Sequence, residues 1–227
     1  MSEELSPRGD ITGNMYTDLG AETREAYEIS KKSRRFARHM IGDRNDEDRI
    51  RQRCAIAVGD LSMADLVRFT HDPVPAGLSA LEKRSPLITD IRMVQVGIQK
   101  KGHESPVHCV LDRDSTPLQN QEITRTSAGF LSYGDELEGC IIVIGNAPSA
   151  LLTVCQMMRE GVRPALVVGT PVGFVNACES KEMLRSLDVP SISTAGTRGG
   201  TPVAVAAMNE IVTLYAERKG IHHEADR

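Results

Sequence analysis

The stretch Cys140-Ile141-Ile142-Val143-Ile144-Gly145-Asn146-Ala147-Pro148 runs from an apolar segment through a glycine turn toward a helical pattern. The same order recurs at Ala165-Leu166-Val167-Val168 before Gly169-Thr170-Pro171-Val172-Gly173-Phe174, and at Ile192-Ser193-Thr194-Ala195 before Gly196-Thr197-Arg198-Gly199-Gly200. Short apolar runs that close on a glycine and open a helix are typical of parallel strands covered on both faces. We therefore predict an α/β fold with a doubly wound, mainly parallel sheet and helices on both faces.

Helix N-termini gather at the carboxyl ends of such strands, which is where an open α/β sheet binds its ligand. Unpaired N–H groups and the positive end of the helix dipole favour a carboxylate or phosphate there. One such turn indicates only strand-to-helix geometry, but three in succession favour an anionic ligand. Neither G-x-G-x-x-G nor G-x-x-x-x-G-K-[ST] occurs, which disfavours a nucleotide. Arg125 lies in a polar approach to a helix, where a guanidinium can grip a carboxylate. On spacing alone, a surface arginine is an equally good interpretation.

The 227 residues are treated as one domain over 20–220, with a flexible N-terminal arm at 1–19 and a polar tail at 221–227. Helical spacing is expected from Ala21 to Ile41. Asn45 is expected to cap a second helix that ends at Gly59, and Asp90 to cap a further helix. The last helix is expected from Pro202 to Arg218, and an alternating strand from Val107 to Leu111.

Composition narrows the classes of partner. Only 4% of residues are aromatic and the net charge is −4, so neither nucleic acid nor an anionic membrane is expected as a partner. The five cysteines form no CxxC pair and the histidines show no metal-ligand spacing, so we expect no disulfide framework and no metal site. No window reaches the roughly 18 apolar residues of a membrane span, and no signal peptide is recognisable. A cytoplasmic protein is the expectation.

Several strings resemble the precorrin-8X methylmutase family of corrin-ring biosynthesis, and the likeness covers about residues 20–213. The resemblance implies a homodimeric α/β isomerase that moves a methyl group from C11 to C12 of precorrin-8 or its cobalt form. The product would be hydrogenobyrinate or cobyrinate, and no external cofactor would be used. The strings that carry the resemblance are Gly145-Asn146-Ala147-Pro148-Ser149-Ala150-Leu151, Gly169-Thr170-Pro171-Val172-Gly173-Phe174-Val175 with Glu179-Ser180-Lys181-Glu182, Thr89-Asp90-Ile91-Arg92-Met93-Val94 with Gly97, and Gly199-Gly200-Thr201.

The substrate implied by the resemblance is a flat tetrapyrrole edged with acetate and propionate groups. Several helix N-termini and Arg125 are expected to converge on one anionic rim of it. Ser30 and Arg125 match family residues that line the tetrapyrrole site. The remaining substrate-binding candidates lie in the glycine turns and are Gly145, Asn146, Gly199 and Gly200.

The catalytic position of the family differs here. A family histidine in an R-x-x-H-A-x-G string is thought to protonate a ring nitrogen, and this chain has Ile56 in its place. Cys54 is expected to point elsewhere, being about 200° away around the helix, and His39 is not expected to face the same pocket as Ser30. Asp60 could share the face of Ile56 if Gly59 does not break the turn, and burial could raise its pKa so that it acts as the acid.

Three interpretations follow from the missing histidine. The enzyme is slow, it uses another donor, or it has kept the pocket and lost the reaction, since a lost general acid costs about 10²–10⁴ in rate. The runner-up function is therefore a catalytically impaired tetrapyrrole-binding relative or carrier. A third alternative, a binder of a smaller anion, rests only on the helix termini. A second departure is Arg198, which lies one place later than the arginine that precedes Gly-Gly in the family, and this puts that contact in question.

Overall fold

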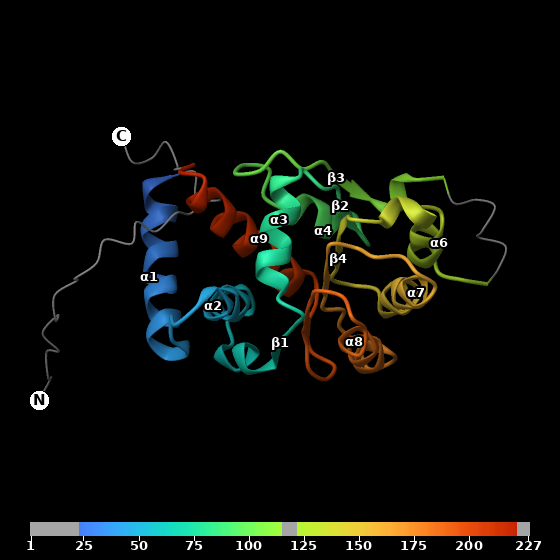
Figure 1. The fold of residues 1–227 in the computed structure, drawn as a ribbon. Helices are drawn as coiled ribbons and strands as arrows, with labels where there is room; N and C mark the ends of the chain where they lie inside the picture. Colours follow the sequence, from blue (N-terminus) through green and yellow to red (C-terminus); the bar gives the residue numbers. More distant parts are fainter. Residues whose placement is uncertain (1–22, 115–121, 222–227) are drawn as a thin grey trace, which may run out of the picture.

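The structure is a computed structural model that describes residues 23–114 and 122–221. Its centre is one sheet of six strands in the order β1-β6-β5-β4-β2-β3 (Figure 1). Five strands are parallel, and β1 at one edge runs antiparallel to β6. The predicted mainly parallel α/β sheet is confirmed, while the antiparallel edge strand was not expected. The strands are β1 (Val67–Thr70), β2 (Leu87–Thr89), β3 (Val107–Cys109), β4 (Ile141–Ile144), β5 (Leu166–Gly169) and β6 (Ser191–Thr194).

The sheet is buried on both faces because its central strands are apolar at every position. In β4, Ile141 and Val143 pack into one core, whereas Ile142 and Ile144 pack into the other. This alternation follows from the two-residue period of a strand. The first face is covered by α2 (Asp46–Val58), η1 (Leu61–Leu66), α3 (Pro73–Glu82), α4 (Arg92–Gly97) and α9 (Thr201–Arg218); the second is covered by η2 (Val110–Asp112), α6 (Arg125–Leu131), η3 (Gly134–Leu137), α7 (Pro148–Arg159) and α8 (Ala177–Arg185).

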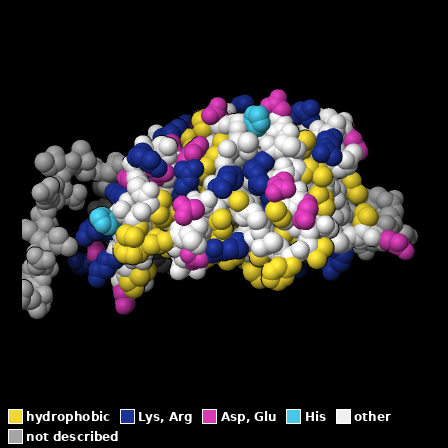
Figure 2. Space-filling model, turned by 90° about the horizontal axis from the view of Figure 1, so that it is seen from below, with side chains coloured by type: hydrophobic (Ala, Val, Ile, Leu, Met, Phe, Trp, Pro, Cys, Tyr) yellow, Lys and Arg dark blue, Asp and Glu magenta, His cyan; other side chains and the backbone are white. Residues whose placement is uncertain are grey.

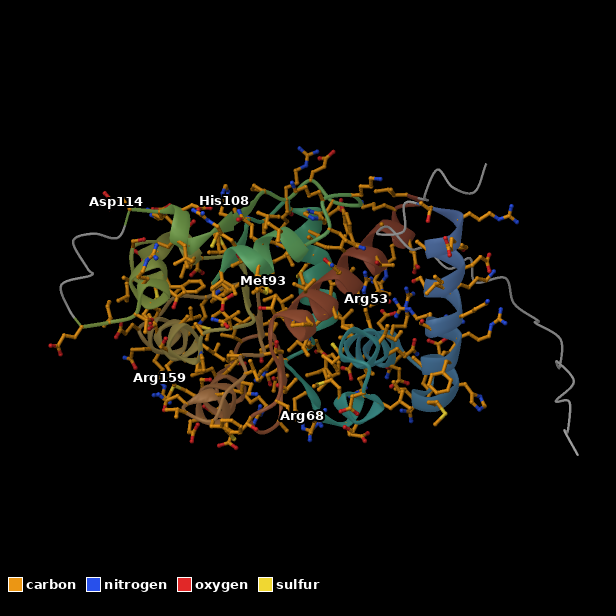
Figure 3. The ribbon with its side chains drawn as sticks, turned by 180° about the vertical axis from the view of Figure 1, so that it is seen from behind. Arg53, Arg68, Met93, His108, Asp114 and Arg159 are labelled. Atoms are coloured by element: carbon orange, nitrogen blue, oxygen red, sulfur yellow. The ribbon has the colours of Figure 1, made fainter. Side chains whose placement is uncertain are left out.

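Helix α1 (Arg24–Ile41) lies outside these layers, at one end of the molecule, where it packs on α2 (Figure 1). It begins after Thr23, whose hydroxyl accepts from the N–H of Ala26 at 3.1 Å. Its buried residues are Arg34 and Ala37, three positions apart, so a single stripe of the helix faces the protein. Figure 1 and Figure 3 both place α6 at the opposite end of the molecule from α1.

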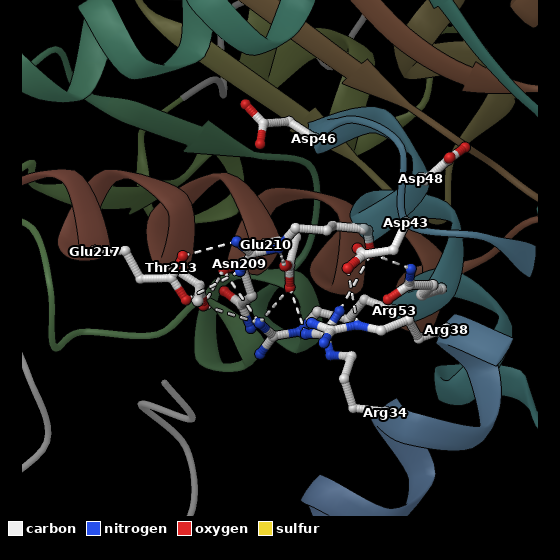
Figure 4. Close-up of polar contacts among 12 residues, drawn as sticks. Arg34, Arg38, Asp43, Asp46, Asp48, Arg53, Asn209, Glu210, Thr213 and Glu217 are labelled. Carbon is white, nitrogen blue, oxygen red and sulfur yellow. Dashed lines mark hydrogen bonds and ion pairs between the residues drawn. The ribbon is translucent and has the colours of Figure 1, made fainter. Parts of the chain in front are cut away.

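A buried ionic cluster joins α1, α2 and α9 (Figure 4). The carboxylate of Glu210 is fully buried and lies 2.6 Å from the guanidinium of Arg34, 2.9 Å from that of Arg49 and 3.1 Å from that of Arg53. Burial by itself raises the pKa of Glu210, but the three guanidinium groups more than offset this and lower the pKa to about 2. The cluster therefore fixes α1 and the middle of α2 against α9.

Most predicted helix ends are confirmed, with one exception. Asn45 accepts from the N–H of Asp48 at 2.9 Å, and Gly59 ends α2 in the left-handed region at φ +65°. The prediction that Asp90 caps its own helix is wrong, because α4 begins after Ile91 and the Asp90 carboxylate bonds a different loop. The strand predicted over 107–111 is shorter, since η2 begins at position 110.

The chain reverses its direction of winding between β2 and β4. From β2 it crosses to β3 at one edge, whereas β4, β5 and β6 progress toward the other edge. In an open α/β sheet a ligand crevice lies at such a reversal, outside the carboxyl ends of the strands. The ends that meet here are Thr89-Asp90 and Ile144-Gly145, and these belong to two of the strings singled out in the sequence.

Candidate functional site

Three loops meet at the carboxyl edge of the sheet: residues 145–147 after β4, 170–176 after β5 and 195–200 after β6. The N–H of Gly200 donates to the carbonyl oxygen of Thr170 at 2.7 Å, and that of Gly173 donates to Thr197 at 3.1 Å. The first loop abuts the start of α9, because a Cβ on Gly145 would lie 2.8 Å from the Cα of Thr201. We call these segments the three-loop edge. It brings together the predicted residues Gly145, Asn146, Gly199 and Gly200.

Gly199 is the position where this packing is tightest. A Cβ at this residue would lie 2.3 Å from the carbonyl oxygen of Thr170, a separation that no side chain tolerates. The backbones of the second and third loops therefore touch directly, with nothing between them. The requirement for glycine here comes from the close approach of two backbones.

Lys181, from the Glu-Ser-Lys-Glu string, is buried beneath the third loop. Its ammonium group donates to the hydroxyl of Thr194 at 3.0 Å and to the carbonyl oxygen of Arg198 at 2.8 Å. Burial lowers the pKa of Lys181 to about 8. Nothing local in the sequence marks Lys181 as buried, because a lysine on a short helix is usually exposed.

Arg198 connects the third loop to the end of α2. Its guanidinium pairs with the carboxylate of Asp60 and donates to the hydroxyl of Ser62 at 3.0 Å. Hydrogen bonds from Ser62, together with Arg198, hold the pKa of Asp60 below its usual range. The expectation of a raised pKa is therefore wrong. Since Gly59 ends the helix before it, Asp60 also does not continue the face of Ile56.

Ile56 lies in the last turn of α2 with 38% of its surface exposed, so an accessible apolar side chain stands where the resemblance led us to expect the catalytic histidine. Cys54 points away, as expected: its thiol is buried, lies 3.7 Å from the carbonyl oxygen of Val203, and has its pKa raised to about 12 by burial. His39 is exposed on α1. Neither Ile56, which has no proton to donate, nor the buried thiol of Cys54 fits the role of a proton donor at position 56.

Arg125 is the first residue of α6, and its side chain is exposed. The preceding Thr124 caps α6 and bonds the hydroxyl of Ser149 at 2.9 Å, on the first turn of α7. Arg125 is therefore held next to the start of α7, beside the first of the three loops. Within the described ranges its guanidinium has no acidic partner, so it is available to a carboxylate from outside the chain.

Ser30 does not lie near Arg125 in the structure. It is half-buried on α1, at the end of the molecule opposite α6 (Figures 1 and 3). One copy of the chain therefore does not gather Ser30 and Arg125, the two residues matched to the family's tetrapyrrole site, into one cavity.

The helix N-termini at the three-loop edge are not equivalent. The N-cap residues of α8 and α9, Asn176 and Gly200, make no side-chain capping bond. The N–H groups leading into α7 are instead bonded to the carboxylate of Asp90, at distances of 2.8 Å from Asn146 and 3.0 Å from Ala147. The N–H groups of the loop before α7 are therefore already bonded within the chain. The acceptor is a residue distant in sequence, since Asp90 follows the neighbouring strand β2.

The second loop carries an apolar tip. Phe174 is 97% exposed, and Val172 and Val175 beside it are also exposed.

A hollow of about 610 Å³ lies on another part of the surface, between the end of α1, α2 and η1. Figure 2 shows basic and acidic side chains intermingled on the underside of the molecule, so that face presents no field of a single sign. No helix in residues 23–114 and 122–221 is both long enough and apolar enough to cross a membrane.

Comparison with known proteins identifies the family to which this chain is similar. The family model described as precorrin-8X methylmutase matches residues 28–214. The cobalt-precorrin-8 methylmutase of Methanocaldococcus jannaschii is 38% identical over 213 residues, covering 88% of this chain and all of the relative. The precorrin-8X methylmutase of Pseudomonas aeruginosa is 35% identical over 194 residues, covering 82% and 93%. The solved structure of a precorrin-8X methylmutase from Thermus thermophilus matches with a TM-score of 0.78 and 31% identity, covering 87% and 99%.

Proposed function

Because the chain belongs to the precorrin-8X methylmutase family, we propose that it is the isomerase that moves a methyl group from C11 to C12 of precorrin-8 or cobalt-precorrin-8, giving hydrogenobyrinate or cobyrinate. The observation that carries the proposal is the extent of the family match, which includes all three loops at the carboxyl edge of the sheet as well as Arg125. The reaction is intramolecular, so no atoms are gained or lost. The protein uses no external cofactor, and cobalt, where present, belongs to the substrate.

In this proposal the three-loop edge faces the rim and one face of the macrocycle. Arg125, without an acidic partner in the described ranges, binds a peripheral carboxylate. Gly145, Gly199 and Gly200 let the loops of this edge pack directly on their neighbours, and the exposed side chain of Asn146 lies beside them. The tetrapyrrole is apolar on its faces, so the exposed tip at Phe174 suits it as well.

We assign the proton-donor role to none of the residues near position 56. Ile56 has no proton to donate, Asp60 is a carboxylate at neutral pH, and the Cys54 thiol faces α9. Catalysis then depends on how tightly the pocket binds the strained ring in the transition state. A relative with the histidine is expected to be faster by the contribution of a general acid, about 10²–10⁴.

The proposed protein is a homodimer whose site is completed by the second copy. The support is the separation of Ser30 and Arg125, since α1 and α6 lie at opposite ends of one chain (Figure 1). In a two-fold dimer, Ser30 of one copy can complete the site that contains Arg125 of the other. We place the enzyme in the cytoplasm, consistent with a biosynthetic family and five free cysteines.

Mixing two inactive variants tests the dimeric site. Ser30→Ala and Arg125→Ala are purified separately, unfolded together, refolded and assayed. Random assembly makes half of the dimers mixed, each with one intact site, so activity is expected to return to about a quarter of the wild-type level. No gain over the separate variants would refute a shared site.

The reaction itself is tested by incubating the protein with precorrin-8 and with its cobalt form while recording the absorption spectrum. The expected result is conversion to the product spectrum, because the methyl shift rearranges the ring chromophore. Product binding without any conversion would instead support the impaired carrier. That alternative gains nothing from the relatives compared above, which are described as methylmutases.

A further inference from the structure

Asp90 is a fully buried carboxylate at the point where the winding of the sheet reverses. One of its oxygens accepts from the N–H of Gly145 at 3.3 Å, and the other accepts from Asn146 at 2.8 Å and Ala147 at 3.0 Å. All three donors belong to the loop between β4 and α7, whereas Asp90 follows β2. One side chain therefore determines the path of a loop 55 residues further along the chain.

No cation balances this charge within the described ranges. Arg92, two residues away, pairs instead with the exposed Asp112. On β3, His108 is exposed and the thiol of Cys109 is buried, and neither forms an ion pair with Asp90. Burial raises the pKa of Asp90, and the backbone N–H groups only partly offset it. A buried charge held only by backbone N–H groups is a costly way to fix a loop, because removing a charge from water is expensive.

We propose that Asp90 is a positioning residue for the methylmutase reaction. Its carboxylate fixes the loop that presents Asn146 to the macrocycle, and it occupies the N–H groups that a substrate carboxylate would otherwise bind. The acidic rim of the substrate is thereby left to the neighbouring Arg125, which Thr124 and Ser149 hold beside the start of α7. This inference rests on the proposed function.

The first test uses the wild-type protein and measures hydrogen exchange at the amides of Gly145, Asn146 and Ala147. These amides are expected to be protected without ligand, and the addition of hydrogenobyrinate should not increase their protection. Increased protection on binding would mean that a product carboxylate, rather than Asp90, occupies the N–H groups, and it would overturn the inference. This result is obtained whether or not any Asp90 variant folds.

The second test compares Asp90→Asn with Asp112→Asn, which removes a nearby exposed carboxylate that does not touch the loop. Asp90→Asn is expected to lower kcat by about 10²-fold through misplacement of the loop, with a melting temperature that remains above the assay temperature. Asp112→Asn should keep the wild-type kcat. A kcat equal to wild type in folded Asp90→Asn would refute the inference.

Chemical rescue separates positioning from general loss of stability. In Asp90→Ala, added formate is expected to enter the emptied space, bind the three N–H groups and restore part of kcat, while chloride at equal ionic strength should not. Folded Asp90→Ala that formate does not rescue would count against the inference. If wild-type protein shows no turnover at all, the proposed function fails, but the exchange experiment still decides what holds the loop.

Discussion

The ammonium group of Lys181 lies 2.8 Å from the carbonyl oxygen of Arg198. A buried lysine without a carboxylate partner among the described residues thus holds the backbone of the loop that carries Gly199 and Gly200, while the side chain of Arg198 reaches out to Asp60. The loop is therefore held on the buried side through the carbonyl oxygen of Arg198 and on the exposed side through the guanidinium of the same residue.

Lys181 gives the first prediction, which concerns pH and stability. Its pKa is about 8 in the folded protein and near 10.5 when unfolded, so between these values the unfolded chain binds more protons. The free energy of unfolding should therefore gain from this group as pH rises from about 8 to 10.5, and the gain should be absent below pH 8. Denaturant unfolding of wild type and Lys181→Met across this range measures it. Lys219→Met, which removes an exposed lysine, is the control; parallel curves for wild type and Lys181→Met would contradict the prediction.

Arg125 gives the second prediction, on affinity. If its guanidinium binds a ring carboxylate, Arg125→Ala should weaken hydrogenobyrinate binding by about 1.5–3 kcal/mol, the range for a hydrogen bond to a charged group. Titration calorimetry measures the change. Arg159→Ala, at the far end of α7, should bind as wild type does (Figure 3). Equal affinities for the two variants would remove Arg125 from the site.

Ile56 gives the third prediction, on rate. Ile56→His should raise methylmutase turnover by up to about 10²–10⁴, since an imidazole would then occupy the family's proton-donor position. The control is Val58→His, two residues further on the same exposed helix end and about 200° around it. Faster turnover in both variants would point to a general effect of charge. Slower turnover in Ile56→His would show that the native pocket works with an apolar group there.

Glu210 gives the fourth prediction, on acid stability. Glu210→Gln leaves three arginines without their buried partner and should cost about 3–5 kcal/mol of unfolding free energy. In wild type the contribution of Glu210 is complete above its unfolded pKa of 4.5 and should be lost as pH falls toward the folded value of about 2. Urea unfolding at several pH values tests both statements. Asp46→Asn, which removes a surface pair with Arg218 between the same helices, should cost at most about 1 kcal/mol.

The central strands and their turns could be predicted because the information is local. Apolar runs such as Ile141 to Ile144 reveal burial on both faces, and the glycines after them indicate a turn into a helix. The antiparallel strand β1 could not be predicted in the same way. Val67-Arg68-Phe69-Thr70 is short and half polar, and only its pairing with β6 makes it a strand.

The interactions that shape the site were hidden because they join distant segments. Asp90 was expected to cap the helix that follows it, which is the nearest set of free N–H groups in sequence, yet in space the loop after β4 is nearer. The ion pairs of Glu210 could not be predicted for the same reason, because its arginine partners lie more than 150 residues earlier in the chain. Asp60 was assessed without Ser62 and Arg198, whose hydrogen bonds together lower its pKa where a raised pKa was expected.

The direct backbone contact between Gly199 and Thr170 has a consequence for engineering this protein. Two loops whose backbones touch directly form one rigid unit. Neither loop can therefore be lengthened, or given larger side chains at the contact, without displacing the other. The adaptable part of the surface is the protruding Val172, Phe174 and Val175, whose side chains extend into open solvent. Libraries aimed at new tetrapyrrole substrates should randomise these three codons and leave the glycines unchanged.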